Sequence, residues 1–356
     1  MADIELRKSD FSLSDDQETL RAAFAGLFER ESPMERVRDA EPLGFDEKLW
    51  QQLVNTGVPT MGLPTARGGD GAGLVELALV AEQHGYRLAP VPLVPVVTAS
   101  RLLARCGNAT TEWLAATAAG TRRVALALHP AQVGVPQLVP GGAVADGIVG
   151  FVEDQLVLAT RDEPIGGPRN IGSEPLAWWD PGDRQESLLE LASSAPARES
   201  FDDACREWRL LTAAGLVGVA QGALDLAVQY AKERMAFGVP IGTFQAVAHP
   251  LVDAACAIVS ARHVVWKAAW LAEHEPDHAL AEIEMAYVHA CRTAEHATRI
   301  GIHTQGGFGF TLESDMQLYF RRAKSAVLLG GDPRARLAVV ADHLYGPANA
   351  ERTERM

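Results

Sequence analysis

The chain has 356 residues, of which 47% are hydrophobic and 22% charged, a balance typical of globular proteins that excludes wholesale disorder and fibrous repeats. A net charge of −14 repels phosphate backbones, so the composition excludes nucleic acid as a partner. No apolar run approaches the ~18 residues of a membrane span and the N-terminus lacks a signal-peptide core, which predicts a cytoplasmic protein without membrane association.

Helical patterns dominate residues 12–120. Ser14 with Gln17 forms a capping-box pattern before an amphipathic stretch over residues 15–31. Further helices are expected over residues 45–57, 74–86, 99–106 and 111–119. The prolines of residues 89–97 predict that this segment is not helical, because each removes a donor and restricts the preceding residue.

The pattern of hydrophobic residues changes near Arg122. Short apolar or alternating runs broken by Gly and Pro, at residues 123–130, 142–152 and 155–160, predict strands. This β section is expected to end near Ala195. From Asp202 or Asp203, as helix caps, long helical patterns return over residues 202–234, 244–274, 277–304 and 315–344. Four long helices with short loops predict an antiparallel bundle.

No metal site is predicted. His289 and His296 have only Glu295 nearby, and we interpret both as solvated helix residues. The cysteines are far apart, without a CxxC pair, and are interpreted as small buried residues of a reducing compartment: Cys106, Cys205, Cys256 and Cys291.

Three loop motifs are candidates for function. The first is Arg234-Met-Ala-Phe237-Gly-Val-Pro-Ile-Gly-Thr-Phe-Gln245, the second is QGGFGFT at residues 305–311, and the third is PTARGGDG at residues 64–71. Arg234 ends one predicted helix and Gln245 opens the next, so both can direct donors at one external anion. Glycines at a turn expose backbone N–H groups that suit close approach to a phosphate or an adenine edge. Each motif taken alone has an alternative interpretation, in which Gly caps the end of a helix and Pro stops it.

Taken together and in this order, the motifs resemble the acyl-CoA dehydrogenase family. The opening FSLSDDQETLR, the run RMAFGVPIGTFQAV and the run QGGFGFTLESDMQLYFRRAK match stretches of that family over nearly the whole chain. The resemblance implies a mainly α fold of three parts. These are an N-terminal helical domain at 1–120, a short central β domain at 121–196 and a C-terminal four-helix bundle at 197–346, followed by a tail at 347–356.

The resemblance also implies a chemistry. Family members bind FAD at a subunit interface and oxidise an acyl-CoA thioester to the 2,3-enoyl-CoA, with electron-transfer flavoprotein as the expected acceptor. A carboxylate removes the α-proton and hydrogen bonds polarise the thioester carbonyl. The expected cofactor-binding residues here are those that match the family's contacts to a partner's FAD: Arg234, Phe237, Gln245, His303, Gln305, Gly306 and Gly307.

The catalytic base of the family is missing from both positions where the resemblance places it. The usual glutamate position is Gly330, and the alternative position near the start of the first bundle helix is Trp208. Glu207 is one residue away, a rotation of ~100° on a helix. Asp332 is two residues past the first position and shorter than Glu. No catalytic residue is therefore assigned, and Glu207 and Asp332 remain as alternative displaced bases.

The β section departs further from the family. It lacks the Thr-Glu-Pro and Trp-Ile-Thr runs that contact the flavin ring from the same chain, and Trp178-Trp179 lies in a different pattern. His303 stands where the family has Gln, while Gln305 directly precedes Gly306. The chain thus retains the contacts to a partner's flavin and lacks those to its own.

This selective loss resembles the small subunits of actinobacterial heteromeric acyl-CoA dehydrogenases that shorten steroid side chains. It predicts a non-catalytic subunit of a heterotetramer with two copies of each chain, whose homologous partner supplies the glutamate and holds most of the FAD. Two alternatives remain open. One is a self-sufficient homo-oligomeric flavoenzyme with a displaced base, and the other is a flavin-free scaffold homologue. The acyl group itself is not identified by the sequence.

Overall fold

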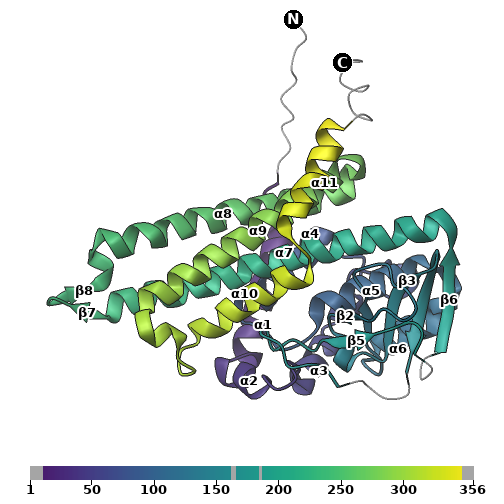
Figure 1. Cartoon of the computed structure of the whole chain (residues 1–356), viewed down its shortest axis with the longest axis horizontal. Coiled ribbons are helices and arrows are strands. Elements are labelled where there is room, and N and C mark those ends of the chain that lie inside the picture. Colours follow the sequence, from purple (N-terminus) through teal and green to yellow (C-terminus); the bar gives the residue numbers. More distant parts are fainter. Residues whose placement is uncertain (1–10, 162–165, 184–186, 347–356) are drawn as a thin grey trace, which may run out of the picture.

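The computed structural model describes residues 11–161, 166–183 and 187–346, so the predicted tail at 347–356 lies outside the described residues. Helices at the N-terminal end pack against one side of a long helical bundle, and a small sheet lies at one end of that bundle (Figure 1). The predicted fold class is confirmed: an N-terminal helical domain, a small β domain and a C-terminal helical domain.

The N-terminal region contains α1 (Asp15–Glu31), α2 (Met34–Asp39), α3 (Glu47–Asn55), α4 (Leu74–Tyr86), α5 (Leu93–Arg105) and α6 (Thr111–Ala118). The predicted capping box is present, because Ser14 accepts from Gln17 N and Gln17 accepts from Ser14 N. In the PTARGGDG motif, a Cβ on Gly69 would collide with the carbonyl oxygens of Thr60 and Leu63. Close packing before α4 therefore explains this glycine.

The prediction that residues 89–97 are not helical was wrong for the second half of that segment. α5 begins at Leu93, six residues before the predicted start at residue 99, with Pro92 at its N-cap and Pro95 in its first turn. N–H groups of a first turn have no partner within the helix, so a proline there removes no hydrogen bond.

The β region forms a four-stranded sheet in the order β1 (Val124–Leu126), β3 (Gly147–Val152), β4 (Gln155–Thr160) and β6 (Ser187–Ser193). β1 runs parallel to β3, and the other neighbours are antiparallel. A second, two-stranded sheet pairs β2 (Gln137–Val139) with β5 (Ala177–Trp179), which carries Trp178-Trp179. β1, β3 and β4 match predicted strands, whereas β2, β5 and β6 were not predicted.

The long helices are α7 (Ser194–Glu233), α8 (Gln245–His274), α9 (Pro276–Gln305) and α10 (Met316–Leu329). α7 starts earlier than predicted, because Asp202 and Asp203 do not cap it but pair with Arg198 and Arg206 along the helix. Among the described helices, α7 alone is long and apolar enough to span a membrane, contrary to the expectation from apolar runs. Since 67% of its apolar window is buried, α7 is the core helix of the bundle.

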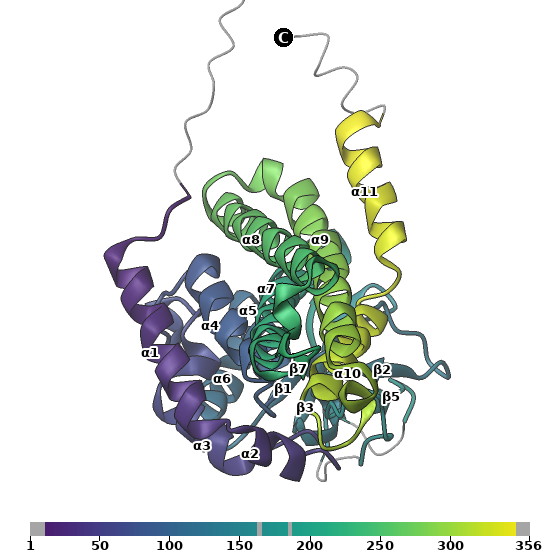
Figure 2. The same cartoon turned by 90° about the vertical axis from the view of Figure 1, so that its left-hand side faces the viewer.

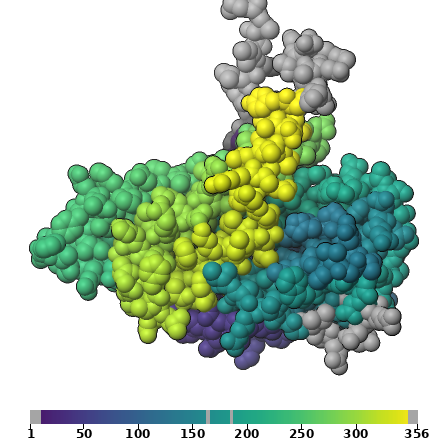
Figure 3. All heavy atoms as spheres, viewed as in Figure 1, coloured from purple at the N-terminus to yellow at the C-terminus, as the bar shows by residue number. Residues whose placement is uncertain are grey.

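The last predicted helix is divided in two. α10 ends at Gly330, Gly331 adopts a left-handed backbone with φ +84°, and α11 (Pro333–Tyr345) starts at a proline with Asp332 as its N-cap. Gly and Pro in succession end one helix and begin another. α11 packs against α9 and then projects away from the body, as the two cartoon views and the space-filling view agree (Figures 1, 2 and 3).

Candidate functional site

Arg234 is the C-cap of α7, and the β7–β8 hairpin that follows it, residues 235–240, lies at the end of the bundle far from the small sheet (Figure 1). The guanidinium of Arg234 is exposed and has no ion-pair or hydrogen-bond partner among the described residues. β7 (Met235–Ala236) and β8 (Val239–Pro240) form the hairpin, and its turn residues Phe237 and Gly238 have φ +53° and +83°. A left-handed conformation at a bulky residue costs ~1–3 kcal/mol. Phe237 is nevertheless held there with its side chain 97% exposed.

The second motif forms a 3₁₀ turn, η6 (Gly306–Phe310), at the end of α9. A Cβ added to Gly306 or Gly307 would meet nothing within 4 Å, so internal packing does not require these glycines. Gly306 has φ +61°, a conformation that glycine adopts without strain. Both glycines are exposed, so another molecule can approach them closely, although the N–H of Gly306 already donates to His303 O.

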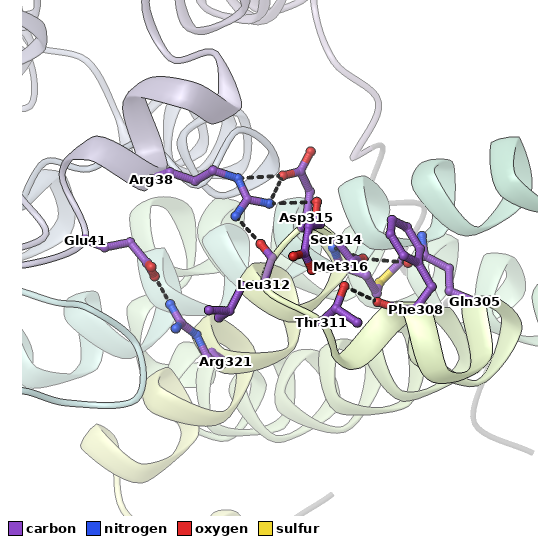
Figure 4. Close-up of polar contacts among 11 residues, drawn as sticks. Arg38, Glu41, Gln305, Phe308, Thr311, Leu312, Ser314, Asp315, Met316 and Arg321 are labelled. Atoms are coloured by element: carbon purple, nitrogen blue, oxygen red, sulfur yellow. Dashed lines mark hydrogen bonds and ion pairs between the residues drawn. The ribbon is translucent and has the colours of Figure 1, made fainter.

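Hydrogen bonds within the turn fix its shape (Figure 4). Ser314 Oγ donates to Gln305 Oε1 over 2.6 Å and accepts from Met316 N over 3.2 Å. Thr311 Oγ1 donates to Phe308 O over 3.0 Å. Gln305 therefore uses its amide oxygen to shape the turn, and its amide nitrogen has no hydrogen-bond partner among the described residues.

Arginines and acids from distant parts of the chain anchor the turn to the N-terminal region (Figure 4). Arg38 of α2 donates to Asp315 Oδ1 and to the carbonyl oxygen of Leu312, and Arg321 of α10 pairs with Glu41. Sequence reasoning missed Arg38, because its partners are more than 270 positions away along the chain and no local pattern marks them.

The two motifs lie together at this end of the bundle. Tyr230, one turn before Arg234, stacks on Phe308 of η6 with ring centroids 6.3 Å apart. Phe237 meets Phe244 edge to face at 6.2 Å. All seven sequence-predicted contacts fall on this exposed aromatic end, with Gln245 starting α8 and His303 in the last turn of α9.

The position expected for the catalytic glutamate has no room for a side chain. Gly330 has an ordinary helical backbone, φ −79° and ψ −2°, so its conformation does not require glycine. A Cβ there would overlap the hydroxyl and ring of Tyr287 of α9 and lie 3.3 Å from Trp208 Cζ3. Burial raises the pKa of Tyr287 well above its usual value, so this phenol is no base at neutral pH.

The alternative glutamate position lies at the same place. Trp208 of α7 is 4% exposed and Tyr287 is fully buried. The two expected base positions therefore lie side by side, and two aromatic rings fill the volume that a carboxylate at position 330 would need.

Glu207 and Asp332, the two displaced-base alternatives, are both engaged elsewhere. Glu207 makes ion pairs with Arg101, at 2.8 Å, and with Arg105. Burial alone would raise the pKa of Glu207, but the two guanidinium groups outweigh it and lower the pKa. Asp332 accepts a hydrogen bond from Arg334 N over 2.9 Å and caps α11.

An apolar cavity of about 130 Å³ lies between the N-terminal helices, the β region and the bundle. Ala326, Leu329 and Trp208 are part of its wall beside the expected base positions. Its polar lining residues include Glu174, whose pKa burial raises, and Arg322, whose pKa burial lowers. Sequence reasoning missed Glu174, since this residue lies in a loop without a motif.

A second cavity, of about 290 Å³, lies on the other side of Trp208 and is rich in arginine. Arg209 pairs with Glu284 at 2.8 Å, whereas Arg336 has no ion pair among the described residues and its Nε is buried without a hydrogen-bond partner. Burial and the positive charges of Arg336 and Arg209 lower the pKa of the nearby His129. This cavity suits an anionic ligand.

Within the described residues no cluster of His, Cys, Asp and Glu suited to a metal occurs. His289 pairs with Ser260 Oγ at 3.0 Å, and His296 Nδ1 lies 3.3 Å from Arg299. The interpretation of all cysteines as buried was wrong for Cys256, which is exposed, and for Cys106, which is half-buried; Cys205 and Cys291 are buried, and all four are free.

Comparisons with known proteins identify acyl-CoA dehydrogenases over most of the chain. The acyl-CoA dehydrogenase N-terminal domain matches residues 14–121 and the acyl-CoA dehydrogenase C-terminal domain matches residues 202–345. "Acyl-CoA dehydrogenase IpdE2" of Mycobacterium tuberculosis is 32% identical over 90% of this chain and 94% of its own length. The homologue of the same name from Mycolicibacterium smegmatis is 31% identical over 91% and 97%.

Solved structures share the fold. The Tcur3481-Tcur3483 steroid ACAD, a G363A variant, superposes with a TM-score of 0.83 at 25% identity, over 95% of this chain and 99% of its own. The ChsE4-ChsE5 complex from Mycobacterium tuberculosis superposes with a TM-score of 0.81 at 24% identity, over 94% and 99%.

Proposed function

This chain belongs to the acyl-CoA dehydrogenase family, and we propose from that premise that it is the subunit without a catalytic base in a heteromeric enzyme. The complex would be a heterotetramer with two copies of this chain and two of a homologous chain. Its reaction would be the α,β-desaturation of an acyl-CoA thioester, with the partner supplying the glutamate.

The observation that carries this proposal is the filled space at Gly330. Removal of an α-proton needs a positioned carboxylate, a group worth typically ~10²–10⁴-fold in rate. Here Tyr287 and Trp208 occupy both positions at which the family places that group. We therefore infer that the complex takes its base from the partner chain.

The exposed end of the bundle fits the outer part of a flavin that the partner holds. FAD supplies the hydride acceptor when it is bound. Arg234 would pair with its diphosphate, Gln245 would donate beside it, and the open backbone of Gly306 and Gly307 would lie against the adenine side. An unpaired arginine and an aromatic side chain held outward against backbone strain are both features of a surface that another molecule covers.

A flavin ring does not fit this chain's own cavity. The volume of about 130 Å³ is below the ~300–1,000 Å³ of typical ligand pockets. The β region presents Pro140 and Gly141 to it, and proline has no N–H with which to bind a ring nitrogen or carbonyl. A Cβ at Gly141 would lie 3.1 Å from Pro95, so the space behind this loop is closed.

The substrate class follows from the relatives. One superposing structure is described as a steroid ACAD, and we propose a bulky, steroid-derived acyl-CoA as the substrate of the complex. The complex would act in the cytoplasm and pass its electrons to an electron-transfer flavoprotein.

Co-expression with a homologous chain that carries the glutamate tests the proposal. We expect acyl-CoA dehydrogenation from the co-purified complex and none from this chain alone. Changing the partner's catalytic glutamate to glutamine should abolish turnover, although this chain is unaltered. Turnover by this chain alone would reject the proposal.

One observation favours a second candidate, the self-sufficient flavoenzyme. Glu174 is a carboxylate in the wall of the apolar cavity, and a raised pKa is a property of many catalytic acids and bases. Ser325 donates to it and Arg322 faces it, which gives it a structural role as well. Glu174→Gln would separate the two: it should leave turnover by the complex intact, and a loss of more than ~100-fold with flavin retained would favour this candidate.

A further inference from the structure

α7 passes along both cavities, and Trp208 is the residue at which one gives way to the other. The arginine-rich cavity is lined by Arg198 and Arg206, which precede Trp208, and by Arg209, which directly follows it. After it, Thr212, Gly215, Leu216 and Val219 line the apolar cavity, at the i+4, i+7, i+8 and i+11 positions of the same helix face. Trp208 itself lines both cavities, together with Leu329 of α10.

The two cavities differ in chemistry. The apolar one is bounded mainly by aliphatic side chains and prolines of three parts of the fold. The other has four arginines in its wall, three of which are paired with acids: Arg198 with Asp202, Arg206 with Asp203 and Arg209 with Glu284. Arg336 keeps its charge uncompensated among the described residues, and its Nε lacks a partner.

An acyl-CoA has the same two chemistries in one molecule: an anionic, phosphorylated end and an apolar acyl end. To bind within this chain, an acyl-CoA would have to extend from the arginine-rich cavity into the apolar cavity. The indole of Trp208 stands between them and is packed in place, since it is 4% exposed and contacts the Gly330 and Tyr287 region.

We propose that Trp208 is a wall that divides the chain's own acyl-CoA path into two separate cavities, so that this subunit cannot seat an acyl group. This inference rests on the proposed function for its substrate class and adds to it. The chain lacks a base, and it also excludes the acyl tail from its own half of the complex. The arginine-rich cavity accepts the phosphorylated end alone, and Trp208 keeps the acyl end from passing on into the apolar cavity.

Chain-length dependence of binding tests the wall. Isothermal titration of the isolated full-length chain would use acetyl-CoA and butanoyl-CoA, which differ by two methylenes. Burying a methylene gives about fourfold in affinity, so two give about 15-fold. The unaltered chain should bind both ligands with the same affinity, or neither of them. Trp208→Ala should open the wall and bind butanoyl-CoA at least ~10-fold more tightly than acetyl-CoA.

Two further variants keep the test decisive. Trp113→Ala removes an equally large ring, 8% exposed, that lines neither cavity, and it should behave as the unaltered chain does. Trp208→Leu keeps a buried apolar side chain and replaces Trp208→Ala if circular dichroism shows that the latter is unfolded. Two results would overturn the proposal that Trp208 divides the path. One is a tenfold preference for butanoyl-CoA in the unaltered chain, and the other is the absence of that preference in a folded Trp208 variant. Neither result depends on flavin or turnover. The binding experiment therefore tests the role of Trp208, and the proposed function is tested separately by turnover of the complex.

Discussion

The hydroxyl of Tyr287 lies where the first side-chain atom of a residue at position 330 would have to be. Tyr287 belongs to α9 and Gly330 ends α10, so the contact closes the junction between two helices of the bundle. Glycine at 330 and tyrosine at 287 form a matched pair. Restoring a glutamate at 330 alone would therefore not restore a base.

Gly330→Ala should destabilise the folded chain by about 1–3 kcal/mol, the typical cost of forcing an extra group into a packed core. Gly307→Ala is the matched control, because a Cβ at Gly307 meets nothing within 4 Å. Denaturant unfolding of the isolated chain measures both. Equal stability of the Gly330→Ala variant and the unaltered chain would contradict the packing described here.

Arg234→Ala should lower flavin retention by the assembled complex by roughly 10- to 150-fold, since a charge-assisted hydrogen bond is worth about 1.5–3 kcal/mol. Arg234→Lys should recover only part of the loss, because an ammonium does not reproduce the guanidinium fork. Equilibrium dialysis of the complex against free FAD measures the affinity. Unchanged affinity in Arg234→Ala would make this arginine a helix-end residue only.

Glu207→Gln should leave the rate per folded complex nearly unchanged. It should lower the free energy of unfolding by about 3–5 kcal/mol, because two arginines lose a buried partner.

The ion pairs of Glu207 also predict that stability depends on pH. The folded pKa of Glu207 is lowered, so its stabilisation is present above the unfolded pKa near 4.5 and is lost as pH falls through the folded value. Asp332→Asn, at an exposed cap, should leave the rate unchanged. Loss of turnover in Glu207→Gln with FAD still bound would make Glu207 the base.

His84 should make the fold less stable between pH 6.5 and 4. Burial lowers its pKa to about 4, so the unfolded chain binds a proton in this range before the folded chain does. Stability is complete above pH 6.5 and falls as the pH drops, by at most about 3 kcal/mol at ~1.4 kcal/mol per pH unit. Thermal unfolding from pH 7 to 5 measures the slope, and His84→Gln should flatten it. An identical slope in that variant would assign the effect to another group.

Features that depend on interactions between neighbouring positions in the chain could be predicted from the sequence. The Ser14–Gln17 capping box, the helix after Gly73 and the exposed glycines of η6 depend on neighbours a few positions away. Features fixed by distant partners could not. Arg38 meets Asp315, and Tyr287 fills the space over Gly330, only after the helices pack. The start of α5 was missed because Pro95 is tolerated in a first turn, a distinction that composition does not make.

In the proposed complex, this chain completes a flavin site which another chain holds. The most direct measurement is the flavin content of the chain purified alone and of the complex with its catalytic homologue, by absorbance after denaturation. We expect little or no FAD in the isolated chain and one FAD per pair of unlike chains in the complex. A full equivalent of FAD on the isolated chain, or two per pair of unlike chains, would contradict the proposal.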